Sequence, residues 1–219
     1  MPAESGNTLL IQFAKAPERG RVKSRMLPDL SPDQALDLHC ELVLWTTRQL
    51  VTSGLGTVQL AVAGDTDHPL FDNCVALGAA QVVAQVGEDL GERMYQALQL
   101  GLQSFEKVLL VGSDCPRLDR DYLAQALDAL ENVEVVLGPA SDGGYVLIGA
   151  TVIGSTVFEG IDWGTSSVFS QTTRRLDAAQ ISWSDLPARQ DIDRPDDLPH
   201  WEAVKKEMDW PLPRFAVGD

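Results

Sequence analysis

Residues 8–26 read TLLIQFAKAPERGRVKSRM, an apolar run that leads directly into a basic loop. The run from Thr8 to Ala14 is short and partly β-branched, which is typical of a buried strand. The whole chain has 17 Lys and Arg against 32 Asp and Glu, so this cationic loop stands out in a chain of net charge −15. General nucleic-acid binding needs a broad basic face, and the sequence therefore predicts a small, local anion site instead.

Short apolar runs and helical patterns alternate along the rest of the chain. Ser31, Pro32 and Gln34 form a capping-box pattern that predicts a helix as far as about Thr52. Strands are expected at residues 57–64, 80–86, 107–112, 134–140, 145–150 and 181–183, and helices at 93–105, 122–130, 166–176 and from 195 onward. This alternation predicts a three-layer α/β/α fold with a mainly parallel, twisted sheet. We expect one domain over residues 1–210 and a loosely packed tail over 211–219.

Composition narrows the classes of function. No apolar run approaches the roughly 20 residues of a membrane span, and the N-terminus lacks the pattern of a signal peptide. Three cysteines without CxxC spacing indicate reduced thiols in a cytoplasmic protein, and three scattered histidines argue against a zinc site. Carboxylates, backbone amides and the basic loop are therefore expected to supply the chemistry, with neither a membrane nor a nucleic-acid polymer as partner.

The basic loop leaves the carboxyl end of the first predicted strand, where ligands bind in open α/β sheets. Gly20 lets the backbone approach a ligand, and Lys23 and Arg25 can each reach a phosphate. The loop has neither the Walker nor the GxGxxG pattern. A solvated charged loop is the alternative interpretation, but the position after a buried strand favours polyphosphate binding.

Two acidic segments are candidates for a metal site. Asp114, in GSDCP, ends the most apolar strand and could hold a metal ion or a substrate hydroxyl. Asp191 and Asp193 form a DxD pair whose side chains share one side in an extended segment, an arrangement suited to Mg²⁺ or Mn²⁺. Turn formation at Asp114 and capping of the helix from Pro195 are the alternatives.

Two glycine-containing segments could contact a sugar or base. Asp142, Gly143 and Gly144 separate two apolar runs, and their backbone amides could face a sugar or phosphate. A hairpin turn is an equally good interpretation, because Asp-Gly strongly favours one, and both can hold. Arg93, in GEDLGERM, is a candidate base or sugar contact.

Taken together, the segments resemble bacterial glycosyltransferases of the arsenosugar-biosynthesis type, in the GT-A or nucleotide-diphospho-sugar transferase superfamily. The matching segments are KAPERGRVKSRM, GEDLGERM, GSDCP, ASDGGYVLIG, IDWGTSSVFSQT and DIDRPDDL. Ser24 and Met26 replace the Thr and Leu that are usual in that family's loop. KSRMLPDLSPDQ also resembles phospholactate guanylyltransferases of the same superfamily.

The resemblance implies a role for each candidate residue. Nucleotide and phosphate contacts would come from Lys15, Arg19, Gly20, Lys23, Arg25 and Arg93. The divalent cation would be held by Asp114 and Asp193, with Asp191 beside them. The sugar or acceptor would face Asp142, Gly143, Gly144 and Tyr145, and the candidate catalytic residues are Asp114, Asp142 and Lys23.

The expected activity is metal-dependent glycosyl transfer from an NDP-sugar to a small-molecule acceptor. Nucleotidyl transfer from an NTP to a phosphorylated small molecule is the alternative, because both reactions build negative charge on phosphate oxygens. A nucleotide-binding regulator without catalysis is a third interpretation. A haloacid-dehalogenase-type phosphatase is disfavoured, since it needs an acidic DxD where this chain has its basic loop.

Overall fold

The computed structural model describes residues 7–27 and 29–207, and seven strands of this part form one sheet. Their order across the sheet is β3-β2-β1-β4-β6-β5-β7. The strands are β1 (Thr8–Lys15), β2 (Thr57–Ala63), β3 (Gln81–Ala84), β4 (Lys107–Gly112), β5 (Val135–Pro139), β6 (Tyr145–Ala150) and β7 (Trp183–Asp185).

The sheet is parallel except at one strand. β1 runs parallel to β2 and β4, and β5 runs parallel to β7, whereas β6 is antiparallel to both of its neighbours, β4 and β5. The prediction of a mainly parallel sheet is therefore confirmed. As a result, the carboxyl ends of β1, β2, β4 and β5 and the start of β6 meet at one edge of the sheet.

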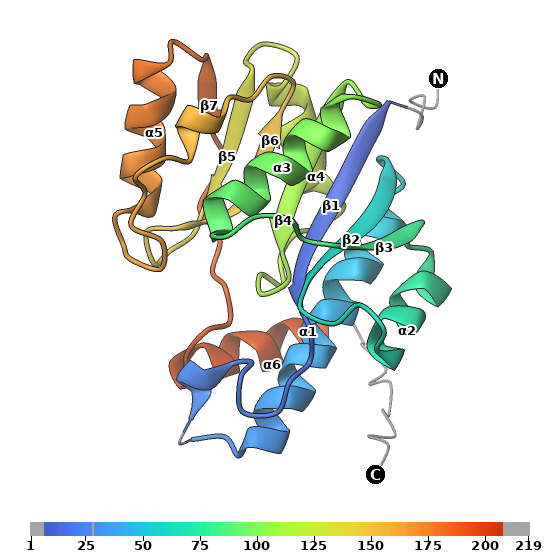
Figure 1. The fold of residues 1–219 in the computed structure, drawn as a ribbon. Helices are drawn as coiled ribbons and strands as arrows, with labels where there is room; N and C mark the ends of the chain where they lie inside the picture. The colour runs from blue at the N-terminus through green and yellow to red at the C-terminus, as the bar shows by residue number, and fades with distance from the viewer. Residues whose placement is uncertain (1–6, 28, 208–219) are drawn as a thin grey trace.

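Helices cover both faces of the sheet, which confirms the three-layer α/β/α prediction (Figure 1). Side chains of α1, α2 and α4 pack on one face, and those of α3 and α5 pack on the other. The helices are α1 (Pro32–Ser53), α2 (Pro69–Leu77), α3 (Leu90–Leu102), α4 (Arg120–Ala129), α5 (Val168–Ala178) and α6 (Leu198–Glu207). Short 3₁₀ helices are η1 (Ser24–Met26), η2 (Ser155–Val157) and η3 (Pro195–Asp197).

Caps explain where the helices begin. The predicted capping box of α1 is present, with Ser31 and Gln34 bonded to each other's backbone N–H groups. α3 begins at Leu90, three residues before the predicted start, because the side chain of Asp89 accepts a bond from the Glu92 N–H. The sequence analysis missed α2, whose cap is the imidazole of His68, a residue outside the usual set of capping side chains.

A separate apolar cluster packs against the end of the basic loop. It joins η1, α1 and α6 through Met26, Leu38, Leu42, Trp45, Ile192, Trp201 and Val204. The rings of Trp45 and Trp201 meet edge to face with centroids 5.2 Å apart, and the Trp45 indole N–H donates to the Pro116 carbonyl at 2.8 Å. Packed side chains thus hold the loop after β1 against α1 and the C-terminal helix α6.

Two further expectations from the sequence concerned the C-terminal tail and membrane-spanning segments. The tail expected over residues 211–219 lies outside the described residues. Within residues 7–27 and 29–207, no helix combines the length and apolar character that crossing a membrane requires.

Candidate functional site

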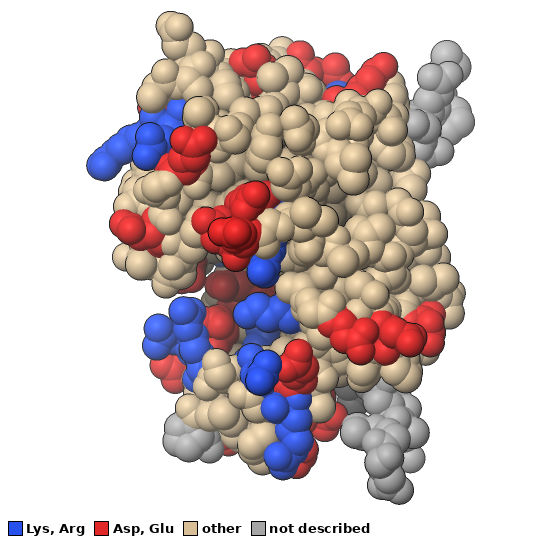
Figure 2. Space-filling view, viewed as in Figure 1, with Lys and Arg blue, Asp and Glu red and all other residues tan. Residues whose placement is uncertain are grey.

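A cavity of about 640 Å³, here called the main cleft, lies at the carboxyl ends of β1, β2 and β4. Figure 2 shows Lys and Arg side chains gathered around a hollow at the middle of the molecule, with acidic side chains beside them. The charged and polar residues that line the main cleft are Lys15, Arg21, Lys23, Ser24, Arg25, His39, Gln85, Arg93, Ser113, Asp114 and Asp193.

Lys23 is built into the wall of the main cleft. Its backbone has φ 50°, in the left-handed region, and its side chain is only 3% exposed. Its ammonium pairs with Asp114 Oδ1 at 2.7 Å and donates to the carbonyl of Ile192. Lys23 therefore ties the loop after β1 to the end of β4 and to the segment before α6.

Asp114 is held in place from several directions. Its carbonyl accepts the Ile192 N–H at 2.8 Å, and the preceding Ser113 hydroxyl donates to the Phe13 carbonyl at 2.8 Å. Burial alone would raise the pKa of Asp114. The ion pair and hydrogen bond from Lys23, with a smaller contribution from His39, outweigh burial and hold the pKa below its ordinary value. The carboxylate is therefore charged at neutral pH.

A second ion pair crosses the main cleft. Arg25 pairs with Asp193 at 2.6 Å, although 168 residues separate them along the chain. The structure thus brings Asp114 and Asp193 into one cleft beside the basic loop, as the sequence analysis expected. Their role as metal ligands stays a prediction.

The far end of the main cleft lies beside β2, β3 and α3. Arg93 donates from Nε to the Gly87 carbonyl at 3.0 Å. The Gln85 amide donates to the carbonyls of Ala61, at 2.9 Å, and Ala14, at 3.3 Å. These bonds fix two polar side chains at the cleft wall.

Five polar residues that line the main cleft were not predicted as site residues: Arg21, Ser24, His39, Gln85 and Ser113. Arg21 belongs to the basic loop and Gln85 directly follows the third strand. Their positions in the sequence therefore indicated that both lie near the ligand-binding edge of the sheet. His39 lies on the face of α1 toward the sheet, with Nε2 3.0 Å from the Lys15 carbonyl, and burial lowers the pKa of its ring. For His39 there was no comparable indication in the sequence, because it lies among apolar residues in the middle of a predicted helix.

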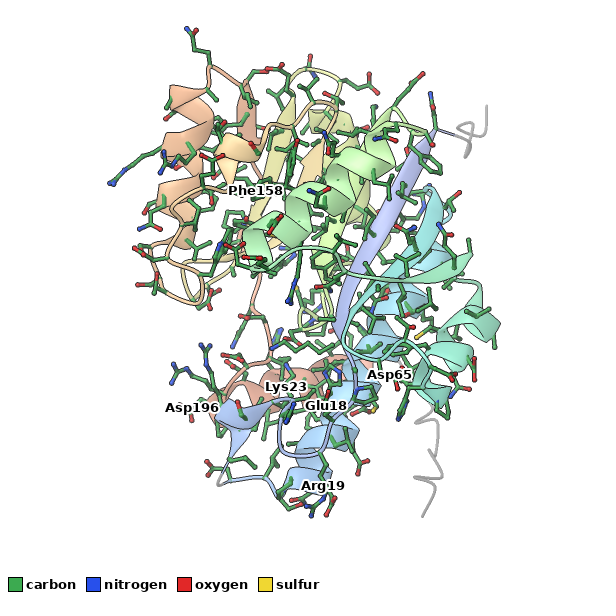
Figure 3. All side chains as sticks on the ribbon, in the orientation of Figure 1. Glu18, Arg19, Lys23, Asp65, Phe158 and Asp196 are labelled. Atoms are coloured by element: carbon green, nitrogen blue, oxygen red, sulfur yellow. The ribbon has the colours of Figure 1, made fainter. Side chains whose placement is uncertain are left out.

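Five predicted residues line neither of the two clefts described here: Arg19, Gly20, Gly143, Gly144 and Tyr145. Arg19 forms a two-bond pair with Asp33, at 2.6 and 3.0 Å, near the start of α1, and Figure 3 shows it pointing away from Lys23. Gly20 sits at φ 74° in the same outer turn and lines neither cleft described here. The Tyr145 ring packs in the apolar layer under α3, with its hydroxyl 3.9 Å from the Met94 sulfur. Side chains alternate between the two faces of a strand, and that of Tyr145 lies on the face covered by α3 and α5.

A second cavity of about 470 Å³, here called the side cleft, adjoins the main cleft and shares Arg25 and Asp193 with it. Its other lining residues are Ser141, Asp142, Gly164, Thr165, Ser166, Gln190, Asp191, Arg194 and Asp197. The sequence analysis placed Asp142 and Asp191 near the ligand but gave the 164–166 segment no role.

The turn between β5 and β6 forms one wall of the side cleft. Asp142 Oδ1 accepts the Gly144 N–H at 2.9 Å. Gly143 has φ 94°, and a Cβ there would overlap the backbone carbonyl of Ser166. The Asp-Gly-Gly segment is therefore a hairpin turn, and of its residues only Asp142 lines the side cleft. The N–H groups of Gly143 and Gly144 are bonded within the turn, to the Ala140 carbonyl and to Asp142, so their contact with a ligand stays a prediction.

The aspartates of the segment before α6 have different roles. Asp197 accepts the backbone N–H groups of Asp193 and Arg194, at 3.0 and 2.8 Å, which is the capping expected of it. Asp191 faces the side cleft, where burial, followed by the negative charge of Asp142 and smaller contributions from Asp114 and Asp193, raises its pKa to about 6. Negative charge is therefore concentrated at this point of the site.

The carboxylates of the two clefts are chemically suited to bind a hard cation, since Mg²⁺ and Mn²⁺ prefer oxygen ligands. Among residues 7–27 and 29–207, however, no three His, Cys, Asp or Glu side chains are grouped as a metal site. Asp114 and Asp193 are instead paired with Lys23 and Arg25. A cation would have to replace these two pairs.

Comparison with known proteins finds one family and one curated relative. The family described as "Uncharacterized protein conserved in bacteria (DUF2064)" matches residues 46–165. The 2-phospho-L-lactate guanylyltransferase of Methanothermobacter thermautotrophicus is 25% identical over 123 residues, or 56% of this chain. The chain spans about half the length of that relative, 53%.

Solved structures cover nearly the whole chain. A protein from Desulfovibrio desulfuricans G20, provisionally described as a nucleotide-diphospho-sugar transferase, has a TM-score of 0.77 and 27% identity, over 91% of this chain and 97% of its own. The 4-diphosphocytidyl-2C-methyl-D-erythritol synthase of Anaerococcus prevotii has a TM-score of 0.61 and 10% identity, over 93% and 97%. The second likeness shows the fold alone.

The curated relative is named as a guanylyltransferase and the Desulfovibrio protein is described as a transferase, in agreement with the group-transfer class predicted from the sequence. The neighbours also confirm the GT-A-like fold, with its seven-stranded, mostly parallel sheet. Because the family match covers more than half of the chain, the protein belongs to the bacterial family DUF2064 and has the fold of the nucleotidyl and nucleotide-diphospho-sugar transferases.

Proposed function

We propose that the protein transfers a glycosyl group from an NDP-sugar to a small-molecule acceptor, with Mg²⁺ or Mn²⁺ as cofactor. The observation that carries this proposal is the main cleft, where Lys23 and Arg25 face Asp114 and Asp193 at the ligand-binding edge of the sheet. The resemblance to arsenosugar-type glycosyltransferases and the likeness to the Desulfovibrio protein support it.

The charges of the main cleft suit the donor's diphosphate. As the bond to the donor phosphate breaks, negative charge grows on the phosphate oxygens, and fixed cations stabilise it more in the transition state than before. Lys23 and Arg25 would leave Asp114 and Asp193 and bind the phosphates. The freed carboxylates would hold the divalent cation, which supplies further positive charge beside the leaving group.

The far end of the main cleft would hold the nucleoside. Arg93 and Gln85 are fixed there by backbone hydrogen bonds and present polar atoms to the cleft. Lys15, at the end of β1, also lines the main cleft. Because Arg25 and Asp193 line both clefts, the phosphates would lie toward the side cleft.

Nucleotidyl transfer is the second candidate, because the curated relative is a guanylyltransferase. In that reaction the acceptor attacks the α-phosphorus of an NTP, and pyrophosphate leaves. A nucleotide-binding regulator without catalysis would use the same main cleft without forming product.

One experiment separates the three candidates. Thermal-shift assays with NDP-sugars and NTPs, each with EDTA, Mg²⁺ or Mn²⁺, identify the stabilising nucleotide. Mass spectrometry with mixed acceptors then detects the product. Metal-dependent stabilisation by an NDP-sugar and release of the NDP support glycosyl transfer, whereas NTP preference and pyrophosphate release support nucleotidyl transfer. Stabilisation without any product supports the regulator, and no stabilisation by any nucleotide contradicts the whole proposal.

A further inference from the structure

The side cleft opens from the phosphate end of the main cleft. The two cavities share only Arg25 and Asp193 among their lining residues, so the pair at 2.6 Å stands at their junction. A group transferred from a diphosphate in the main cleft would therefore pass directly into the side cleft. Its volume of about 470 Å³ is within the range of small-molecule sites.

Carboxylates outnumber cations in the side cleft. Asp142, Asp191, Asp193 and Asp197 line it, against Arg25 and Arg194. Arg25 is matched by Asp193, and Asp197 is occupied by backbone N–H groups and by the Gln190 amide at 2.9 Å. Asp142 and Asp191 have no Lys or Arg within ion-pair distance in the described part of the chain. Asp142 and Asp191 thus remain without a cationic partner for a ligand to bind, although Oδ1 of Asp142 already accepts the Gly144 N–H at 2.9 Å.

The remaining polar groups also favour a donor-rich ligand. The Ser141 hydroxyl donates to the Arg189 carbonyl at 3.2 Å, and the Thr165 hydroxyl donates to the Asp162 carbonyl at 2.8 Å. With its proton already used, the Ser141 oxygen joins the carboxylates as a hydrogen-bond acceptor, whereas the Thr165 oxygen already accepts the Ser167 N–H at 3.4 Å. A ligand with hydroxyl or ammonium donors satisfies them, whereas a phosphate dianion would face two carboxylates and one arginine.

We propose that the side cleft binds the acceptor, and that the acceptor presents hydroxyl or amino groups there rather than a phosphate. The proposal rests on the proposed function of the main cleft. It also separates this chain from a phospholactate-type acceptor, the substrate class in the name of its curated relative. An acceptor hydroxyl oxygen would form the new bond to the transferred group. The bond to the donor phosphate would break, the phosphate would keep the electron pair, and a carboxylate of the side cleft would take the hydroxyl proton.

The test uses the ¹⁵N-labelled full chain and matched probes: glucose, glucosamine, glucose 6-phosphate and inorganic phosphate, each with EDTA and with Mg²⁺. Glucose or glucosamine should shift the amide signals of residues 141–144 and 164–166. Inorganic phosphate should shift those of residues 20–25 alone. If glucose 6-phosphate or inorganic phosphate shifts the side-cleft amides at lower concentration than glucosamine does, the proposal is overturned. It is also overturned if nucleotides shift the main cleft but neither sugar shifts the side cleft.

Variants give a second readout. In Asp142→Asn/Asp191→Asn, the preference for glucosamine over glucose 6-phosphate should fall by at least about tenfold, because like-charge repulsion is removed. Asp196→Asn is the matched control, since Asp196 is exposed on the same segment and lines neither cleft. An unchanged preference in the double variant contradicts the proposal. Absence of nucleotide shifts in the main cleft would instead contradict the proposed function, so the two failures are distinguishable.

Discussion

Lys23 shows how a single residue in the basic loop differs from a simple phosphate ligand. Its side chain is almost fully buried between Asp114 and the Ile192 carbonyl, which lie 91 and 169 residues away in the chain. It is therefore a structural tie in the free protein and a candidate phosphate ligand once nucleotide arrives. Arg25, whose side chain is 51% exposed, can exchange partners at lower cost.

The arginines of the basic loop should differ in their effect on nucleotide binding. Arg25→Ala should weaken nucleotide affinity by about 1.5 to 3 kcal/mol, because one charge-assisted contact to phosphate is lost. Arg19→Ala should leave the affinity unchanged, since Arg19 pairs with Asp33 outside the cleft. Isothermal titration calorimetry checks both variants, and equal losses in the two would show that the cations act only through general charge.

Asp191→Asn should stabilise the free protein at neutral pH. Because the folded-state pKa of Asp191 is raised from 3.8 to about 6, its charge destabilises the fold increasingly as pH rises from about 4 to about 6. After allowance for solvent screening, the variant should gain about 1 to 2 kcal/mol at about pH 7.5 and nothing at about pH 4. Urea unfolding at both pH values measures this gain. Asp196→Asn is the control, and an equal gain there would mean that general charge relief, rather than the site, is responsible.

The sequence predicted which charged residues line the main cleft better than it predicted which side chains contact each other. The sequence analysis correctly brought Lys23, Arg25, Asp114 and Asp193 to one cleft, because each leaves a strand end or precedes a helix at the same edge. The sequence did not show that Arg19 pairs with Asp33 in the first turn of α1, or that His39 is buried at the cleft wall. Local pairing and side-chain direction depend on the folded backbone, and pattern alone does not show them.

At the scale of elements, the β5–β6 hairpin joins the sheet to the side cleft. Its turn carries Asp142, and the glycine after it lets the 164–166 segment lie against the backbone. The Phe169 N–H also donates to the Gly143 carbonyl at 2.9 Å, which ties the start of α5 to this turn. The cleft wall therefore depends on one residue without a side chain.

Gly143→Ala should destabilise the fold far more than Gly144→Ala. At Gly143 the new methyl group meets both a positive φ of 94° and the Ser166 carbonyl, and we expect a loss of about 2 to 4 kcal/mol. At Gly144, whose φ lies outside the left-handed region, the methyl group meets only Asp142 Oδ1, at 3.3 Å. Urea unfolding compares the two variants, and similar losses would contradict the account of this turn.

Most elements were predictable because the local signals agree with the fold. Apolar runs gave the strands, and the capping box gave the start of α1. α3 and α4 begin earlier than predicted, at the caps Asp89 and Asp119. α2 was missed because a histidine caps it, and the inverted direction of β6 cannot be read from an apolar run that looks like any other strand. Strand direction is set by which neighbours pair, and those neighbours are distant in sequence.

At the scale of the whole molecule, the site joins the loop after β1 to the C-terminal segment before α6. The two meet through Lys23 and the Arg25–Asp193 pair, over the apolar cluster that contains Met26 and Trp201. The same contacts therefore form the main cleft and hold the C-terminal segment in place. The resemblance to known families indicated a transferase, but not this dependence on the C-terminal segment.

Lys23→Met should loosen the C-terminal segment selectively. Without the lysine, Asp114 loses its counter-charge, and we expect amide hydrogen exchange in residues 190–193 to become at least about tenfold faster. Exchange in β1 and β4 should change little. Lys107→Met is the control, because it removes a lysine that pairs with Glu131 at the opposite edge of the sheet. If both variants accelerate exchange in residues 190–193 equally, Lys23 is not the tie.

The edge-to-face contact of Trp45 with Trp201 has an optical consequence. Two indoles held 5.2 Å apart at 82° couple their electronic transitions, so the pair should give a near-ultraviolet circular dichroism signal that neither ring gives alone. Trp201 lies on α6, directly after the segment that carries Asp191 and Asp193, whereas Trp45 lies on α1. A ligand that draws that segment inward changes the coupling between the rings. The protein thus carries an intrinsic spectroscopic reporter of how α6 moves relative to α1 when a molecule binds.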